Sequence, residues 1–422
     1  MSATISGIAA SPQPVVSTAD LRHQFPTWHQ RVAAAACIAV AVVTGRDGPQ
    51  PWPAVRGLLV LLVVGCTLLA GRRLGGRRAA AILIVVGFAA MLVGAGIGMP
   101  YLIETGASTI TIAGITALVA GLLAVGAGIA SVLAGTRWWH KLLAIVTGLA
   151  IVVVIGIPLT VAMSMTNVPP MARGGATPAS AGLSYEDVEL QTEDGVRLDA
   201  WYVPSHNGSA IVLLGGSGSV RSGEVDRAAA IASHGFGVLL LDVRGHGTSE
   251  GEAMLLGWYG ERDLAPAIDY LLNRPDVVDG RVGVVGMSMG AQQAVAAGGA
   301  DRRIRAVVAD GVVGRHGSEL TPQHPLDAFM GWVTMHATEL MTGAPHPVPL
   351  VDAARDAAPN RLLVVTGENV PPELEFAEKL VAASPATVQV WVAPNTGHTE
   401  GFDNHPAKWV ARVTDFLTES LQ

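Results

Sequence analysis

The sequence predicts two physically different parts: a transmembrane helical region, followed by a doubly wound α/β domain with a mostly parallel sheet of about eight strands. Three observations predict this division. Hydrophobic residues make up 50% of the 422 residues and charged residues only 14%, against about 25% charged in soluble proteins. The long apolar stretches all lie before residue 168. After residue 183, short β-branched runs alternate with helical stretches, the pattern of an α/β domain.

Charge divides the chain at the same place. Residues 1–168 carry ten Lys and Arg against three Asp and Glu, a net charge of +7, and the remainder carries −14. An acidic domain lacks the basic face that nucleic-acid phosphates require, so we expect no nucleic-acid partner. The two cysteines, Cys37 and Cys66, both lie in the apolar region. The second domain therefore has no disulfide framework and no cysteine-based metal site.

A helix needs about 20 apolar residues to cross the hydrocarbon core of a bilayer. Several stretches before residue 168 reach or approach this length, and the shortest, 32–44, has only 13 residues. The sequence therefore predicts an N-terminal tail over 1–31 and a membrane region over 32–166 with four or five transmembrane helices. The other four stretches are 54–70, 79–103, 109–134 and 142–165.

Short loops predict the orientation of these helices. The loops 72–78 and 136–141 are basic, which favours the cytoplasmic side, whereas 104–108 carries Glu104 and no basic residue. With five helices, everything after residue 166 lies outside. We therefore expect a multi-pass integral membrane protein with an extracytoplasmic second domain and the lipid bilayer as a partner.

Residues 167–183 are rich in Pro, Gly, Ala and Ser and predict a linker to the domain at 184–422. The strand segments are continuously apolar, as expected for a parallel sheet that is covered on both faces. The predicted strands are 185–191, 196–203, 209–214, 237–243, 281–286, 304–309, 361–366 and 387–393. The predicted helices are 224–233, 261–273, 289–299, 373–383 and 405–421.

One serine stands where a predicted strand meets a predicted helix. The stretch Gly-Met-Ser-Met-Gly at 286–290 follows the apolar run of the fifth strand and opens the helix at 289–299. This strand-turn-helix context is the one a nucleophile elbow requires, in which small flanking residues let the strand and helix pass closely. Ser288 is thus the candidate nucleophile, with the N–H of Met289 directed into the site.

A serine needs a base to act as a nucleophile. His398 follows the last predicted strand in a glycine-containing loop, which is the position expected for that base. An oxyanion hole needs a second N–H from the loop after the third strand. We assign that donor to Ser217, with the neighbouring Gly216 as the alternative.

Three motifs together resemble the α/β-hydrolase fold family over about residues 185–421. Asp-Val-Arg-Gly-His-Gly-Thr-Ser-Glu-Gly at 242–251 is similar to that fold's loop after the fourth strand, 286–290 to its elbow, and 396–401 to its histidine loop. The resemblance implies a serine hydrolase of the esterase, lipase, thioesterase or peptidase-like kind. It implies no cofactor and leaves the apolar region unexplained.

The acid of the triad departs from the family pattern. Members usually carry Asp three residues after the glycine that ends the seventh strand, but here that position is Val370. Glu373 and Glu368 lie nearby, and Asp310 ends the sixth strand, where some members place their acid. We expect Glu373 to orient the histidine, with Glu368 and Asp310 as alternatives.

The segment 311–350 predicts a small cap-like insertion. Its large apolar residues are expected either to line an acyl pocket or to pack the cap on the domain; they are Phe329, Met330, Trp332, Met335 and Met341. The histidines of this segment lack metal-binding spacing, so we expect no metal.

The sequence as a whole predicts a membrane-anchored serine hydrolase that cleaves carboxylic esters or related acyl compounds of small molecules or lipids through an acyl-enzyme. Two alternatives remain open. One is an acyltransferase that uses the same acyl-enzyme, and the other is a non-catalytic binding or assembly module on a membrane platform. The sequence does not indicate an oligomeric state.

Overall fold

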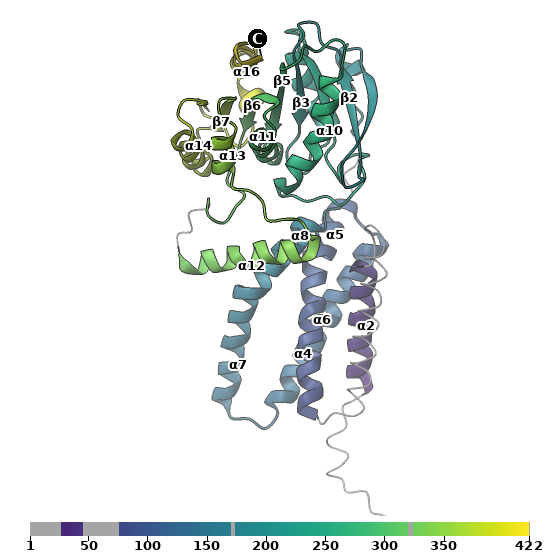
Figure 1. Cartoon of the computed structure of the whole chain (residues 1–422). Helices are drawn as coiled ribbons and strands as arrows, with labels where there is room; N and C mark the ends of the chain where they lie inside the picture. Colours follow the sequence, from purple (N-terminus) through teal and green to yellow (C-terminus); the bar gives the residue numbers. More distant parts are fainter. Residues whose placement is uncertain (1–26, 45–75, 170–173, 320–323, 422) are drawn as a thin grey trace, which may run out of the picture. The chain divides into compact units, whose positions relative to one another are not determined.

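The computed structural model describes residues 27–44, 76–169, 174–319 and 324–421. The chain divides into two compact units (Figure 1). One unit contains most of the helices before residue 145, and the other contains residues 146–422 together with 95–111. The boundary falls inside three apolar helices, so the second unit includes most of the last apolar segment.

Three helices are long and apolar enough to cross a membrane, and they cover Ala79–Thr105, Thr109–Leu133 and Trp138–Thr166. A shorter apolar helix covers Arg31–Val40, and the predicted span 54–70 lies outside the described residues. Two of the long helices contain one π-helical turn each. The elements are α2 (Thr27–Thr44), α4 (Gly76–Val93), η1 (Gly94–Gly98), α5 (Met99–Thr105), α6 (Thr109–Leu133), α7 (Trp138–Ile151), η2 (Val152–Gly156) and α8 (Ile157–Thr166).

Helices α4 and α6 meet through small residues. A Cβ added to Gly121 would lie 2.5 Å from the carbonyl oxygen of Gly87, and one added to Gly87 would lie 2.8 Å from that of Gly121. Glycine is therefore required on both helices for the backbones to approach this closely. Small residues at such contacts are typical of helix packing in membranes, where apolar side chains gain little by leaving lipid.

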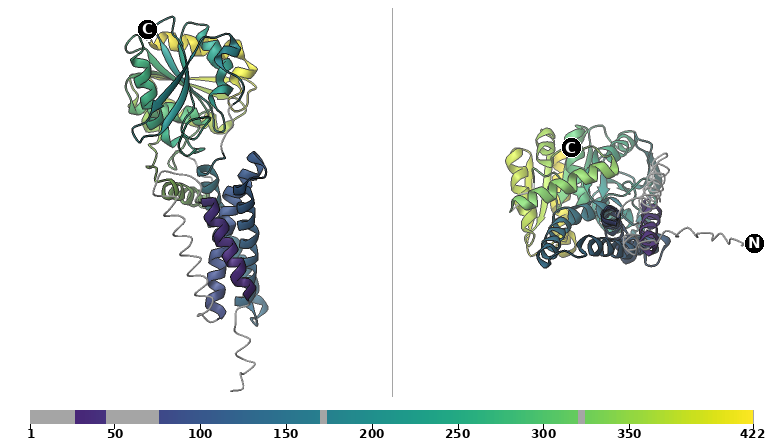
Figure 2. Two further views of the ribbon diagram at one scale, coloured as in Figure 1. Left: turned by 90° about the vertical axis from the view of Figure 1, so that its right-hand side faces the viewer. Right: turned by 90° about the horizontal axis from the view of Figure 1, so that it is seen from below.

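The second unit is built on one eight-stranded sheet with the order β1-β2-β4-β3-β5-β6-β7-β8. Strand β2 pairs antiparallel with β1 and β4, and all other neighbours are parallel. The sheet is twisted, as seen in Figure 2. The strands are β1 (Glu186–Gln191), β2 (Arg197–Val203), β3 (Ala210–Leu214), β4 (Gly237–Leu241), β5 (Val282–Met287), β6 (Ile304–Asp310), β7 (Arg361–Gly367) and β8 (Val388–Ala393).

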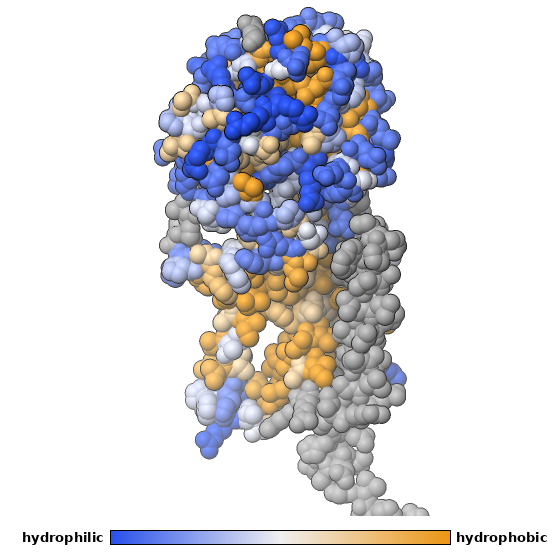
Figure 3. All heavy atoms as spheres, in the orientation of Figure 1, coloured by the Kyte–Doolittle hydropathy of each residue, from blue (hydrophilic) through white to orange (hydrophobic). Residues whose placement is uncertain are grey.

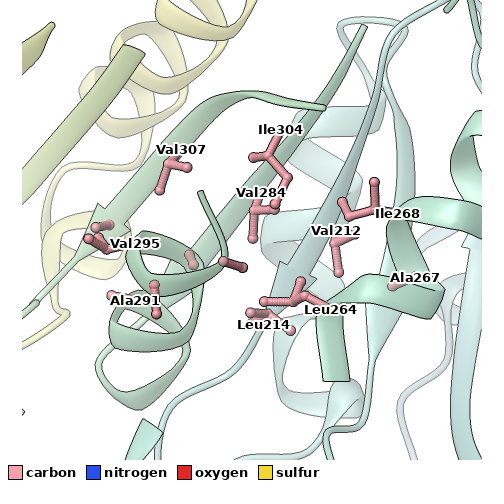
Figure 4. Close-up of a cluster of buried hydrophobic side chains, with 14 of the residues drawn as sticks. Val212, Leu214, Leu264, Ala267, Ile268, Val284, Ala291, Val295, Ile304 and Val307 are labelled. Atoms are coloured by element: carbon pink, nitrogen blue, oxygen red, sulfur yellow. The ribbon is translucent and has the colours of Figure 1, made fainter. Parts of the chain in front are cut away.

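Helices cover both faces of the sheet, which explains why its central strands are apolar throughout. One face packs against α10, α11, α13 and α14, and part of this layer is drawn in Figure 4. The other face packs against α9 and α16. These helices are α9 (Val225–Ala232), α10 (Gly260–Leu272), α11 (Met289–Ala300), α13 (Leu350–Asp356), α14 (Pro371–Ala383) and α16 (Pro406–Leu421). The remaining helical elements are η3 (Pro178–Ala181), η4 (Arg221–Glu224), η5 (Gly257–Tyr259), α12 (Pro325–Thr342) and α15 (Gly401–Asn404).

The predicted doubly wound fold is confirmed, with each strand placed within two residues of its expected bounds. Two details differ. The predicted last helix is α16, but a short additional helix, α15, precedes it and ends before Pro406, which cannot donate a backbone hydrogen bond to continue it. The sequence also missed α13 and the long helix α12 within the insertion at 311–350.

Candidate active site

Ser288 occupies a strained turn between β5 and α11. Its backbone has φ 52° and ψ −111°, a conformation that residues with a side chain seldom adopt and that is often found at functional sites. The Ser288 N–H donates to the Asp310 carbonyl at 2.8 Å, and this bond fixes the turn to the neighbouring strand β6. The serine is thereby presented at the carboxyl edge of the sheet, where ligands of open α/β sheets bind.

The glycines on either side of the serine are required by close backbone contacts. A Cβ on Gly286 would lie 2.2 Å from the carbonyl oxygen of Gly290. A Cβ on Gly290 would lie 2.5 Å from the carbonyl oxygen of Gly215, in the loop after β3. The glycine pair therefore lets strand, helix and loop converge on Ser288.

His398 lies in the loop after β8 and links Ser288 to a carboxylate. Its Nε2 is 2.8 Å from the Ser288 Oγ, and its Nδ1 is 2.5 Å from the Glu373 Oε1. In the neutral tautomer that fits both contacts, the Nδ1–H donates to Glu373 and the serine hydroxyl donates to Nε2. A general base for serine needs this arrangement, because one ring nitrogen must be free to accept the hydroxyl proton.

Glu373 comes from the first turn of α14 and is fully buried. Its second oxygen, Oε2, accepts from the Gly367 N–H at 2.9 Å, which holds the carboxylate against the end of β7. One oxygen is thus anchored to the sheet while the other faces the histidine. The longer side chain of Glu reaches from a helix position three residues beyond the usual site of Asp.

The other two candidate acids make different contacts. Glu368 accepts from the Asn395 N–H at 2.7 Å and supports the loop after β8. Asp310 is buried and accepts from the Trp409 indole N–H at 2.7 Å. Of the three carboxylates that the sequence offered, Glu373 is therefore the one whose hydrogen bond to His398 the structure provides.

Electrostatics at the site match this geometry. The hydrogen bond to Glu373 raises the pKa of His398 above its usual value, and the charge of Asp310 adds to the effect. Burial raises the pKa of Asp310 to about 6. The negative charge of Glu373, with that of Asp310, therefore stabilises the imidazolium that forms when His398 accepts a proton.

The loop after β3 lies directly against the serine. A Cβ on Gly216 would be 3.3 Å from the Ser288 Cβ, and the Ser219 N–H donates to the Gly216 carbonyl at 3.0 Å, which closes a turn around Ser217. Met289 is the first residue of α11, where backbone N–H groups have no acceptor within the helix. Both predicted oxyanion donors thus belong to backbone segments adjoining Ser288.

The motif at 242–251 has a supporting role beneath the site. Asp242 accepts from the backbone N–H of Arg221 at 2.6 Å and from its guanidinium at 2.9 Å. Arg244 donates through Nε to the fully buried Asp263 at 2.7 Å. The buried His246 donates through Nδ1 to the Arg244 carbonyl at 3.0 Å, and its burial lowers its pKa, so it holds this loop as a neutral ring. The sequence singled out this motif by resemblance, but Arg221 and Asp263 are partners that only the structure identifies.

Two of the five large apolar residues in the insertion at 311–350 meet neither expectation for a cap. Phe329 and Trp332 on α12 are exposed, so they neither line an enclosed pocket nor pack the insertion on the domain. Met335 alone of the five packs against a buried cluster, which contains Met254 and Trp258. Across the described ranges, no group of three or more His, Cys, Asp or Glu is arranged to hold a metal ion.

Three kinds of comparison show which known proteins this chain is similar to. The model of the X-Pro dipeptidyl-peptidase (S15) family matches residues 165–404. The protein Rv2307c of Mycobacterium tuberculosis is 27% identical over 251 residues, which is 58% of this chain and 84% of that protein. The α/β-hydrolase domain-containing protein WAV2 of Arabidopsis thaliana is 35% identical over 118 residues, 27% of this chain and 38% of that one. Among solved structures, the Pyrococcus furiosus esterase PF2001 is 25% identical with a TM-score of 0.49, covering 61% of this chain and 99% of the esterase.

Proposed function

The chain belongs to the X-Pro dipeptidyl-peptidase (S15) family, which has the α/β-hydrolase fold, and on this premise we propose that it is a membrane-tethered serine hydrolase. Its substrates are carboxylic esters or related acyl compounds. The observation that carries this proposal is the unbroken hydrogen-bond chain from Ser288 through His398 to Glu373, at 2.8 and 2.5 Å.

In the proposed reaction, the Ser288 Oγ attacks the acyl carbon while His398 Nε2 takes the hydroxyl proton. Glu373 holds the Nδ1–H tautomer and stabilises the imidazolium. The backbone N–H groups of Ser217 and Met289 hold the oxyanion of the tetrahedral intermediate. His398 returns the proton to the departing alcohol, and an acyl ester on Ser288 remains. Water then repeats the two steps, with His398 as its base, and releases the carboxylic acid.

The proposal includes an extracytoplasmic domain. The long apolar helices provide the membrane anchor, and the basic loop at 136–141 favours the cytoplasmic side for the start of the last helix. The end of that helix then lies outside, together with the domain that follows it. A reporter fused after Gln422 that is active only outside the cytoplasm is the expected result, and one active only inside would contradict this orientation.

Labelling with a fluorophosphonate probe tests the activated serine. Membranes that contain the full chain should be labelled, and Ser288→Ala should remove the label. Ser219→Ala is a matched control, since this hydroxyl lies in the neighbouring loop and donates a hydrogen bond to Glu224 rather than to His398. If the intact protein is not labelled, the hydrolase proposal fails and a non-catalytic binding module takes its place.

The family match favours one further candidate, a peptidase. The family takes its name from the release of X-Pro dipeptides, and the proposed acyl-enzyme chemistry applies equally to an amide bond. A panel that contrasts p-nitrophenyl esters with X-Pro-p-nitroanilides separates the two activities. Adding an alcohol acceptor to the ester assay also detects an acyltransferase, which would form a new ester in preference to free acid.

A further inference from the structure

Helix α12 carries a stripe of large apolar side chains on its surface. Leu326, Phe329, Trp332 and Leu340 follow one another at spacings of three, three and eight residues, which places them on the same face of the helix. All four are exposed, with Trp332 at 56% and Leu340 at 88%. Soluble proteins seldom expose a contiguous patch of this kind unless it meets a partner or a membrane.

The helix is held by the last apolar span. It packs on α8 and on the preceding turn η2, and its own buried residues, Ala337 and Thr338, lie off the stripe. A further contact joins the end of the span to the α/β domain, because the Leu255 N–H of the loop after β4 donates to the Met165 carbonyl in α8 at 2.9 Å. Helix α12 therefore has a fixed place beside the end of this span.

The length of the span Trp138–Thr166 indicates how deep in the membrane helix α12 lies. The helix Trp138–Thr166 has 29 residues, about 43 Å at 1.5 Å per residue, whereas about 20 residues cross the hydrocarbon core. Trp138 and Trp139 are exposed aromatic residues at its start, as expected at one membrane interface. Counting about 20 residues from there reaches Ile157. Helix α8 thus leaves the hydrocarbon at the opposite interface, and α12 packs on it at that level.

The chemistry of the surroundings favours lipid as the partner of the stripe. The part of the span beneath α12 exposes apolar residues in the same unit, among them Val146, Leu149 and Val152. Apolar residues also gather over α12 itself in Figure 3. Helix α12 also contacts η2, which belongs to this part of the span. Helix α12 contains no Lys or Arg. Of its two acids, Asp327 lies off the stripe, and Glu339 borders the stripe beside Trp332 and pairs with His346.

We propose that α12 is an in-plane interfacial helix that inserts its stripe among the lipids of the bilayer that the helix Trp138–Thr166 crosses. Because it has no basic residue, apolar burial rather than attraction to anionic headgroups holds it there. It emerges from the loop after β6, at the same edge of the sheet as Ser288. Insofar as the proposed hydrolase function holds, this placement brings the catalytic edge to the membrane surface and makes acyl esters of membrane lipids the substrate class.

Spin-label depth measurements test the helix independently of catalysis. The full chain, with Cys37→Ser and Cys66→Ser, is reconstituted in phosphatidylcholine vesicles with a single label at Trp332→Cys, Phe329→Cys or Asp327→Cys. Labels at 329 and 332 should be relaxed by oxygen and protected from an aqueous nickel complex, whereas the exposed Asp327 position, off the stripe, should show the reverse.

Three results would overturn the proposal. The first is equal access of the nickel complex to positions 332 and 327. The second is spin–spin broadening at 332 that disappears on dilution with unlabelled protein, which would identify a second copy as the partner, and the third is protection at 332 only when anionic lipid is added.

A separate assay addresses the substrate. Phe329→Ser combined with Trp332→Ser should leave hydrolysis of a soluble short-chain ester unchanged and lower that of a bilayer-embedded ester several-fold. If Phe329 and Trp332 prove to be inserted but the wild-type chain cleaves neither ester, the hydrolase proposal fails and the interfacial helix stands.

Discussion

The two parts of this molecule bury opposite kinds of residue. In the α/β domain, Trp201 and Trp409 are fully buried beside the sheet. In the helical region, Ala90 and Ala124 fill the contacts between helices, while large residues such as Val85, at 69% exposed, face outward. The α/β domain therefore buries large side chains, whereas the helices expose large side chains and bury small ones.

Such an inversion is expected when two parts of a chain fold in different media. In water, burial of large apolar side chains drives folding, so the biggest residues collect inside. In lipid that gain disappears, and close packing of small residues such as Gly87 and Gly121 holds helices together. If the two parts are stabilised in different solvents, a substitution in one part should leave the properties of the other unchanged.

The largest effect that is confined to one part should come from substitution of Glu373, the proposed acid of the triad. Glu373→Gln removes the carboxylate that fixes the His398 tautomer, and loss of the orienting acid in such triads lowers turnover by about 10⁴. Glu368→Gln is the matched control, since its carboxylate contacts the Asn395 backbone instead. Turnover of a soluble ester and the amount of protein in the membrane are both measured. Equal losses from the two variants, or depletion of Glu373→Gln from the membrane, would contradict the separation.

The same charged substitution should act differently in the two parts. Leu149 is exposed near the middle of the last span, where a lysine costs about 2.5 to 3.5 kcal/mol of insertion free energy. Val390 is partly exposed on β8, and a lysine there should change unfolding free energy by at most about 0.5 kcal/mol. Carbonate extraction reports insertion, and thermal unfolding reports the domain. A Leu149→Lys chain that inserts normally would argue against a transmembrane role for this helix.

Glycine substitutions give a smaller, matched contrast. Gly121→Ala places a Cβ 2.5 Å from a backbone oxygen of α4, and Gly286→Ala places one 2.2 Å from a backbone oxygen of α11. Overpacking of this kind costs about 1 to 3 kcal/mol. The first change should loosen the helices in detergent while probe labelling persists, and the second should reduce labelling while the helices stay inserted. Loss of labelling in Gly121→Ala would show that the two parts depend on each other.

The sheet could be predicted because the pattern that marks each strand lies within a few consecutive residues. A run such as 210–214, apolar at every position, is consistent only with burial on both faces, and the structure places it at the centre of the sheet. The role of Ser288 could also be predicted, since the spacing of Gly286 and Gly290 reflects backbone contacts within the same few residues. His398 followed from its place after the last strand.

Longer-range relations could not be predicted in this way. Choosing among Glu373, Glu368 and Asp310 depends on where a helix start, a strand end and a loop come together, and no local pattern gives that distance. Helix α12 was missed for a related reason. An apolar stripe such as Phe329 and Trp332 looks the same in sequence whether it faces a pocket, a core or lipid.

The smallest predicted effect is on the pH dependence of the reaction. The hydrogen bond to Glu373 raises the pKa of His398 above the usual 6.5, and only the neutral ring can accept the Ser288 proton. Activity should therefore fall as pH drops through a midpoint above 6.5, by up to about tenfold per unit. Glu373→Gln removes the main cause of the shift, so its midpoint should move to lower pH. Asp310→Asn removes only a weaker charge interaction and should move it less. The rate of fluorophosphonate labelling against pH measures all three midpoints even when turnover is low. A midpoint that stays in place or rises in Glu373→Gln would show that this carboxylate does not govern the histidine.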